Sequence, residues 1–409
     1  MISQKLNDQI TRIGPNTAAG AVHRKYWQPA ALTDEVTGDD PMLPVNLLGE
    51  RLVLLRAPTG ELVLTARVAD PDEAPTHHPD RDDIRVPEGA PVYPVVEKNG
   101  IYFAYLGAGD PPAFPNFDCF RAPESHVFAF KGLWECNWLQ ALEIGIDPSH
   151  ASFLHRFLQD EDPSEGYGKQ FRDKAANTDM PITQVLREYP RPDIEVDETP
   201  FGLKITSLRH MKNGLTHVRV TNQVFPSAIS IPMSREMIIT QWHVPVDDEN
   251  CYWYTMFTSF QNPVNKELMR EQRLKEHRLP DYAPLKNQAN NYHYDPEEQK
   301  SLTYTGMGMD INVHDQWAVE SMGAIQDRTR EHLGRGDAAI IRYRLMLRKA
   351  IKAIETGHEE RLPMQDRQDT PQIVGPLSND SIAESDDWLA ASVAADMERR
   401  RAAPWDATV

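Results

Sequence analysis

The sequence predicts an α+β protein in which antiparallel sheets pack against helices. Two observations predict this class. Strand-like runs rich in Val, Ile, Thr, Tyr and Trp occur in two separate parts of the chain, and a charged helix with one apolar face follows the second part. The expected strands cover residues 44–48, 51–56, 61–65, 101–106, 201–209, 217–224, 235–244 and 252–259.

Residues 1–125 are expected to form a small β lobe, the first domain. Its strand-like runs are short, and the sequence Pro58-Thr-Gly60 supplies a turn between two of them.

Residues 126–360 are expected to form the second domain, an antiparallel sheet flanked by helices. The turn residues of 247–250 lie between its last two strands. A helix over 338–354 has apolar positions among arginines and lysines, which predicts one packed face. The apolar positions assigned to that face are Ile341, Leu345, Leu347 and Ile351.

Two polar segments are expected to lie outside this framework. Residues 158–185 are charged and are predicted to form a loop over a pocket. Residues 361–409 are acidic and proline-rich, and are predicted to be a peripheral extension with one amphipathic helix near 382–399.

Composition excludes several functions and locations. The chain has 43 Lys and Arg against 61 Asp and Glu, a net charge of −18, whereas a nucleic-acid-binding protein needs a basic surface. The three cysteines form no disulfide framework, which is typical of a reducing compartment, and Cys136 and Cys251 are expected to be buried thiols. The sequence shows no secretory signal and no membrane-spanning run. We therefore expect a cytoplasmic protein.

The most informative segment places His150 and His155 five residues apart, with Asp147 three residues ahead. Two imidazoles and one carboxylate suit non-haem Fe(II) and leave positions open for oxygen and substrate. Five residues of a regular helix turn through about 500°, so the two histidines would lie about 140° apart around its axis. Both can reach one ion only if the helix is broken or bulged between them. The alternative is a pair of ordinary histidines that end a core helix.

The pattern N-W-L-Q-x-x-E-x-x-I-D-x-x-H-x4-H over residues 137–155 resembles the iron site of Rieske-type aromatic-ring-hydroxylating oxygenases, in the phthalate and phenoxybenzoate dioxygenase branch. Other segments resemble the same family in the same order: 14–29, 93–107, 314–323 and 327–334. The resemblance covers roughly residues 10–355. It implies a helix-grip (START-like) catalytic domain with mononuclear Fe(II).

The resemblance implies that His150, His155 and a downstream aspartate bind this iron. Asp315 fills the place of that aspartate, although His314 stands where the family usually has glutamine. Asp310 is the competing carboxylate. Asp315 can also be explained as the N-cap of the helix that follows it. His314 could be a group that supports an iron ligand, but we expect it to be exposed.

Asp147 matches the family carboxylate that connects the iron-bound His150 to a Rieske cluster on a neighbouring subunit. A carboxylate hydrogen-bonded to a ligand imidazole fixes its tautomer, and positions three apart share a helix face. Asp147 can also be the N-cap of a helix that begins at Pro148. Glu143 remains open between a group near the iron and an ordinary buried glutamate.

Members of this family usually carry a [2Fe–2S] cluster on C-x-H and C-x-x-H motifs. Neither motif is present, because none of the three cysteines has a histidine two or three residues downstream. A short acidic, proline-rich loop between residues 63 and 93 stands in the place of the cluster, and we expect its His77 and His78 to be solvated. We therefore predict a truncated Rieske-like lobe without a [2Fe–2S] cluster.

The resemblance implies a mono- or dioxygenase of aromatic compound catabolism, which hydroxylates or oxidatively dealkylates an aromatic substrate with O2. Electrons would come from a separate Rieske-bearing subunit, or a ferredoxin and its reductase, in a trimer or hetero-oligomer. A carboxylate on the substrate would require an arginine, for which Arg219 is the first candidate and Arg209 and Arg235 are alternatives. Two other functions remain open: an iron enzyme without external electrons, and a non-catalytic subunit of a hetero-oligomeric oxygenase.

Overall fold

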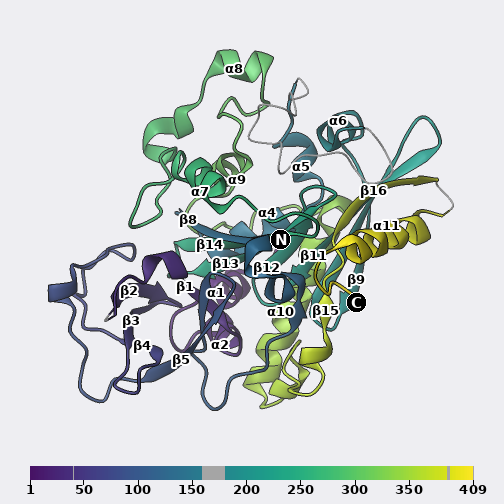
Figure 1. Ribbon diagram of the computed structural model, residues 1–409. Coiled ribbons are helices and arrows are strands. Elements are labelled where there is room, and N and C mark those ends of the chain that lie inside the picture. The colour runs from purple at the N-terminus through teal and green to yellow at the C-terminus, as the bar shows by residue number, and fades with distance from the viewer. Residues whose placement is uncertain (40, 159–179, 385–386, 409) are drawn as a thin grey trace.

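The computed structural model describes residues 1–39, 41–158, 180–384 and 387–408. Within this part of the chain, two antiparallel sheets and their helices form an α+β fold, which confirms the predicted class. In Figure 1 the N-terminal sheet lies beside the larger sheet, and α5 to α9 gather above the larger one.

The smaller sheet is formed entirely within the first 104 residues, in the order β1-β6-β5-β4-β3-β2. Its strands are β1 Gln28–Leu32, β2 Met42–Leu47, β3 Glu50–Arg56, β4 Leu62–Ala66, β5 Val92–Lys98 and β6 Ile101–Ala104. The four predicted strands are present, with ends shifted by one or two residues. β1 and β5 were not predicted, and each contains a proline, which weakens the sequence signal of a strand.

The loop between β4 and β5 contains the two histidines that were expected to be solvated. His77 is exposed, as predicted. His78 is half-buried in a recess that it shares with Lys131, and burial lowers its pKa to about 4. The prediction for His78 was therefore wrong, because the loop folds back against the larger sheet.

The larger sheet has the order β8-β14-β13-β12-β11-β10-β9, and a final strand, β16, pairs with β11. Its strands are β8 Val127–Trp134, β9 Asp193–Thr199, β10 Gly202–His210, β11 Leu215–Val224, β12 Ala228–Pro232, β13 Met237–Pro245, β14 Cys251–Ser259 and β16 Asn379–Glu384. The four predicted strands of this region correspond to β10, β11, β13 and β14.

Helices pack against several strands of the larger sheet. The helices are α1 Gln4–Thr11, α2 Ala18–His23, α3 Asp118–Arg121, α4 Trp138–Gly145, α5 His150–Phe153, α6 Ile182–Glu188, α7 Lys266–Leu274, α8 Pro296–Ser301, α9 Ile311–Glu320, α10 Ala338–Glu355 and α11 Trp388–Ala402. Two short strands, β7 Asn116–Phe117 and β15 Val374–Gly375, pair in parallel. No helix among the described residues combines the length and the apolar character that a bilayer span requires.

The C-terminal tail is part of the fold, which corrects the prediction of a peripheral extension. Its strand β16 pairs with β11 over six residues, and α11 packs beside β16 (Figure 1). The buried guanidinium of Arg400 donates to Asp118 at 2.8 Å and so fixes α11 to the start of α3. The predicted helix over 382–399 begins only at Trp388, and residues 382–384 belong to β16 instead.

The long helix α10 has nearly the predicted bounds, but its packed face is rotated. Leu347 and Ile351 are buried as predicted, whereas Ile341 is 39% and Leu345 43% exposed. The packed stripe instead includes Tyr343, which is fully buried. The helix packs on α2 and β9, and these contacts, which the sequence pattern does not show, select the face.

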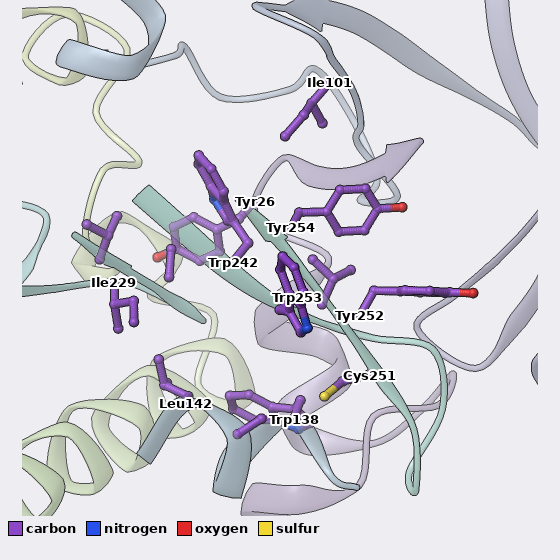
Figure 2. Packing of buried hydrophobic residues seen from close by; sticks show 14 of the residues in the cluster. Tyr26, Ile101, Trp138, Leu142, Ile229, Trp242, Cys251, Tyr252, Trp253 and Tyr254 are labelled. Atoms are coloured by element: carbon purple, nitrogen blue, oxygen red, sulfur yellow. The ribbon is translucent and has the colours of Figure 1, made fainter. Parts of the chain in front are cut away.

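One continuous hydrophobic core joins α4 to the strands. Figure 2 shows Trp138 and Leu142 of α4 in the same cluster as Ile229, Cys251 and Trp253 of the larger sheet. All three cysteines are buried free thiols, which confirms the prediction for Cys136 and Cys251. This packing holds α4 in place, and the residues of the candidate site follow the C-terminal end of this helix in the chain.

Candidate metal centre

Three side chains that could ligate a metal converge between α5 and α9. The helix α5 ends at Phe153 and has Leu154 as its C-cap, so His155 follows directly after the helix, and both imidazoles approach the same carboxylate. The Nε2 atoms of His150 and His155 lie 3.8 and 3.2 Å from Oδ1 of Asp315. The three possible ligand atoms lie within 4.8 Å of one another, and the described part of the chain has no other such group. The break between the histidines that the spacing required is present.

The donor set fits a divalent iron. Ligands bonded to one ion at about 2.1 Å lie no more than about 4.2 Å apart, and both imidazole–carboxylate distances meet this limit. The side chains of His150, His155 and Asp315 are only 18%, 11% and 16% exposed. Oδ1 of Asp315 is buried and accepts no hydrogen bond. Burial raises the pKa of Asp315 to about 6, although His150 and His314 act in the opposite direction. A cation at this position would remove that penalty.

Each imidazole is oriented by a hydrogen bond on the nitrogen that faces away from Asp315. Nδ1 of His150 donates to the backbone carbonyl of Asp147. Nδ1 of His155 lies 3.5 Å from Nδ1 of His314, whose Nε2 lies 2.8 Å from the carbonyl oxygen of Gly308. A carbonyl only accepts, so His314 donates from Nε2 and can accept from His155 at Nδ1. These bonds leave the two Nε2 lone pairs directed at Asp315, as metal ligation requires.

The structure corrects one expectation for α9 and rules out one alternative. His314 is fully buried rather than exposed, because its ring packs between His155 and the backbone of the preceding loop. Asp315 is not an N-cap, since the helix begins at Ile311 and Asp310 caps it by accepting from the backbone N–H of Asn312.

Asp310 has a different partner from the three converging side chains. It forms a buried ion pair of 2.9 Å with Arg273. Burial alone would raise the pKa of Asp310, but Arg273 and the cap hydrogen bond outweigh burial and lower it. The structure therefore brings Asp315, and not Asp310, to the two histidines.

Asp147 lies next to the triad, but its carboxylate makes a local contact. Oδ1 accepts from the backbone N–H of Ser149 at 2.8 Å, and the contact to His150 uses the backbone carbonyl instead. The side chain therefore stabilises the turn into α5, close to the cap role that the sequence left open. Asp147 also lines the adjoining pocket.

Glu143 points away from the triad into a buried ion-pair cluster. Its carboxylate accepts from Arg328 at 2.8 Å and from Arg344 at 3.0 Å. Burial would raise the pKa of Glu143, but the two guanidinium groups outweigh it and lower the pKa. Of the two interpretations of Glu143, a group near the iron or an ordinary buried glutamate, the structure supports the second.

A cleft with a cavity volume of about 130 Å³ opens beside the triad, and His150, His155 and Asp315 form part of its wall. Most of the remaining lining is apolar: Trp134, Ile144, Phe157, Ile182, Leu186, Ile229, Ile231, Met233, Ile239 and Ile311. The predicted loop over 158–185 is only partly testable, because residues 159–179 lie outside the described chain. Its final residues belong to α6, which is a helix and lines the cleft.

The three arginines considered for substrate binding occupy different places. Arg219 lies in the cleft wall, but its guanidinium already donates to the carboxylate of Asp380. Arg209 is buried and donates to the carbonyl of Pro148 and the hydroxyl of Ser152, so it supports α5. Arg235 is exposed in the turn between β12 and β13, outside the cleft.

Two polar features of the cleft were missed by sequence reasoning. Asp380 reaches Arg219 from a strand about 160 residues further along, and no local pattern indicates that pairing. Gln241 and His243 of β13 are hydrogen-bonded at 3.1 Å and line the same cleft. Their alternate positions on a predicted strand place them on one face, which is the signal that could have identified them.

Comparison with known proteins agrees with these observations. The family model described as "LigXa C-terminal domain like" matches residues 104–403. The oxygenase subunit of phthalate 4,5-dioxygenase from Pseudomonas putida is 27% identical, over 87% of this chain and 88% of that protein. The oxygenase subunit of 3-chlorobenzoate-3,4-dioxygenase from Comamonas testosteroni is 26% identical, over 87% and 90%. That of tert-butanol monooxygenase / tert-amyl alcohol desaturase from Aquincola tertiaricarbonis is 27% identical, over 84% and 76%. As its motifs predicted, this chain belongs to the family of Rieske-type oxygenase alpha subunits.

Proposed function

We propose that this chain hydroxylates or oxidatively dealkylates an aromatic substrate with O2, with one Fe(II) ion held by His150, His155 and Asp315. The observation that supports it best is the buried Asp315 Oδ1, which accepts no hydrogen bond and faces two oriented imidazoles. Fe(II) with two imidazoles and one carboxylate keeps open positions and supplies the chemistry of oxygen activation.

The chain's own residues hold and shield the reacting groups. The Asp147 carbonyl and the His314 ring orient the two ligand imidazoles. The apolar wall of the cleft excludes water and contacts the faces of a bound ring, and Trp134 and Phe157 are its largest aromatic members. A substrate seated there lies beside the open side of the triad.

An aromatic substrate also agrees with relatives named for phthalate and 3-chlorobenzoate. A further relative is named for a 5,5'-dehydrodivanillate O-demethylase, which supports dealkylation as an alternative to ring hydroxylation. The relative named for tert-butanol widens the range of substrates to be tested.

Electrons are proposed to come from a separate Rieske-bearing subunit, or from a ferredoxin and its reductase, since the sequence has no C-x-H or C-x-x-H motif. Asp147, at the rim of the triad, is the residue proposed to connect this donor to His150. We propose that the protein forms a trimer or hetero-oligomer in the cytoplasm. Its proposed parts are a cluster-free lobe over 1–125, a catalytic domain over 126–360, and a tail over 361–409 that adds a strand to the sheet of the catalytic domain.

The test supplies oxygen and electrons together, so that no partner protein is needed. Iron-loaded protein is mixed with anisole and ¹⁸O-labelled hydrogen peroxide, because R–H + H2O2 → R–OH + H2O balances without another reductant. We expect ¹⁸O-labelled methoxyphenol from ring hydroxylation, or unlabelled phenol together with formaldehyde when the methyl group is oxidised and released (ArOCH3 + H2O2 → ArOH + HCHO + H2O). A His155→Ala variant given the same total iron is the control for chemistry of free iron. Absence of product, or equal product from His155→Ala, would contradict the proposed function.

A further inference from the structure

We infer that the cleft selects an uncharged substrate, because Asp380 from the C-terminal strand neutralises the arginine in its wall. The inference rests on the proposed function only in taking this cleft as the substrate site. It narrows the substrate to an aromatic molecule whose polar groups are neutral, such as an ether, a hydroxyl or an amide.

The pairing of Arg219 with Asp380 is built into the sheet. The two residues are directly opposite in the register of β11 and β16, so their side chains share one face. Nη1 of Arg219 donates to Oδ2 of Asp380, and Nη2 donates to the carbonyl oxygen of Pro232 at 2.9 Å. The side chains of Arg219 and Asp380 are 14% and 1% exposed. The guanidinium is therefore held in the wall by two protein acceptors, with one hydrogen-bonding edge already used for a carboxylate.

The second oxygen of Asp380 is also used. Oδ1 accepts from Nε2 of His217, which is fully buried. Burial by itself would raise the pKa of Asp380, but Arg219 and His217 outweigh it and hold that pKa below its ordinary value. Burial, with Arg209 and Arg219, lowers the pKa of His217 more than Asp380 raises it, which favours the neutral imidazole. These three side chains hold one positive and one negative charge. The neighbouring guanidinium of Arg209 is buried outside the cleft lining, where it donates to the Pro148 carbonyl and the Ser152 hydroxyl.

The remaining described wall offers no cation for a substrate carboxylate. Arg219 is the only Lys or Arg side chain among the lining residues that the structure describes. The lining carboxylates, Asp147 and Asp315, offset the two charges of an Fe(II) ion at the triad. A carboxylate moved from water against the described part of this wall would lose its hydration without gaining an unpaired cation there, which is strongly disfavoured.

Neutral polar groups, in contrast, have partners in the cleft. Uncharged donors and acceptors are spread over its wall: Thr183, Thr221, Gln241 and Asn312. Each can hydrogen-bond an ether, hydroxyl or amide oxygen without a change in net charge.

The test compares two probes of nearly equal shape, 2-naphthamide and 2-naphthoate, by calorimetric titration of the iron-loaded protein without oxygen. We expect the wild-type protein to bind 2-naphthamide at least tenfold more tightly. Asp380→Asn removes the negative charge and leaves the amide to bond His217 and Arg219. This variant should bind 2-naphthoate at least tenfold more tightly than the wild type, with a change of less than threefold for 2-naphthamide.

A double variant, Arg219→Met with Asp380→Asn, covers the case in which Asp380→Asn alone does not fold. It removes both charges, so the preference between the two probes should stay within threefold of the wild type. A tenfold loss of 2-naphthoate binding in this variant would show that Arg219 receives the carboxylate and would overturn the inference. Equal or tighter wild-type binding of 2-naphthoate, or failure of both probes to bind, would also overturn it. Binding needs neither electrons nor oxygen, so a protein that prefers 2-naphthamide but forms no product contradicts only the proposed function.

Discussion

Replacement of His314 by phenylalanine should weaken Fe(II) binding by about tenfold, because the ring fixes the tautomer of His155. Nδ1 of His314 lies 3.5 Å from Nδ1 of His155, and Nε2 of His314 lies 2.8 Å from the carbonyl oxygen of Gly308. Phenylalanine keeps the shape of the buried ring and removes both nitrogens. Loss of a group that orients a ligand imidazole costs roughly 10–100-fold in metal affinity. The 3.5 Å separation is long for a hydrogen bond, which places the expected loss at the lower end, about 1.4 kcal/mol.

The assay is an anaerobic titration of Fe(II) against a chelator of known affinity. His314→Gln is the matched control, because an amide can donate to Gly308 and accept from His155, and its Fe(II) affinity should change by less than about threefold. Circular dichroism verifies that both variants are folded. Wild-type affinity in folded His314→Phe, or equal losses in both variants, would refute the proposed hydrogen-bonded chain.

Three further predictions follow from single buried or capping contacts. Asp147→Asn should keep its iron, since an amide oxygen can still accept from the Ser149 N–H. Its partner-driven turnover should fall by more than about 100-fold, and its peroxide-driven turnover should fall much less. Equal losses in the two assays would contradict an electron-linking role. Burial lowers the pKa of His23 to about 3. Below pH 6.5 this histidine therefore binds a proton in the unfolded chain but not in the folded one, and the free energy of unfolding falls by about 1.4 kcal/mol for each pH unit. His23→Phe should therefore make melting temperature fall less steeply between pH 6.5 and about 5, and a profile parallel to the wild type would contradict this. Glu143→Gln should cost about 3–5 kcal/mol in thermal or denaturant unfolding, because it leaves the buried guanidinium of Arg328 without a carboxylate and that of Arg344 with Glu331 alone. Folded Glu143→Gln should still bind iron normally, and selective loss of iron would instead place Glu143 in the metal site.

The sequence was sufficient to predict the residues that converge on the candidate metal site. His150 and His155 are close in the chain, and their five-residue spacing already required the helix break that separates α5 from His155. Most strands were also predictable, because β-branched and aromatic runs between turn residues have few other stable conformations.

The features that sequence reasoning missed depend on contacts between distant segments. The pairing of β16 with β11 brings Asp380 to Arg219, and nothing near either residue specifies that register. The burial of His314 depends on how α9 meets the loop after α5, and the rotation of α10 depends on its contacts with α2 and β9. Each of these changes the chemistry of a side chain without changing the local pattern around it.

The most direct test of the central claim is to measure iron and acid-labile sulfide in protein loaded with Fe(II) and desalted without oxygen. The wild type should hold about one iron per chain without stoichiometric sulfide, and Asp315→Ala should lose most of that iron, because a three-ligand site has no spare donor. Asp310→Asn is the control on the same helix, since asparagine keeps the N-cap of α9, and it should hold as much iron as the wild type. Stoichiometric sulfide would contradict the cluster-free chain. Full iron in Asp315→Ala with loss in Asp310→Asn would contradict the assigned ligands.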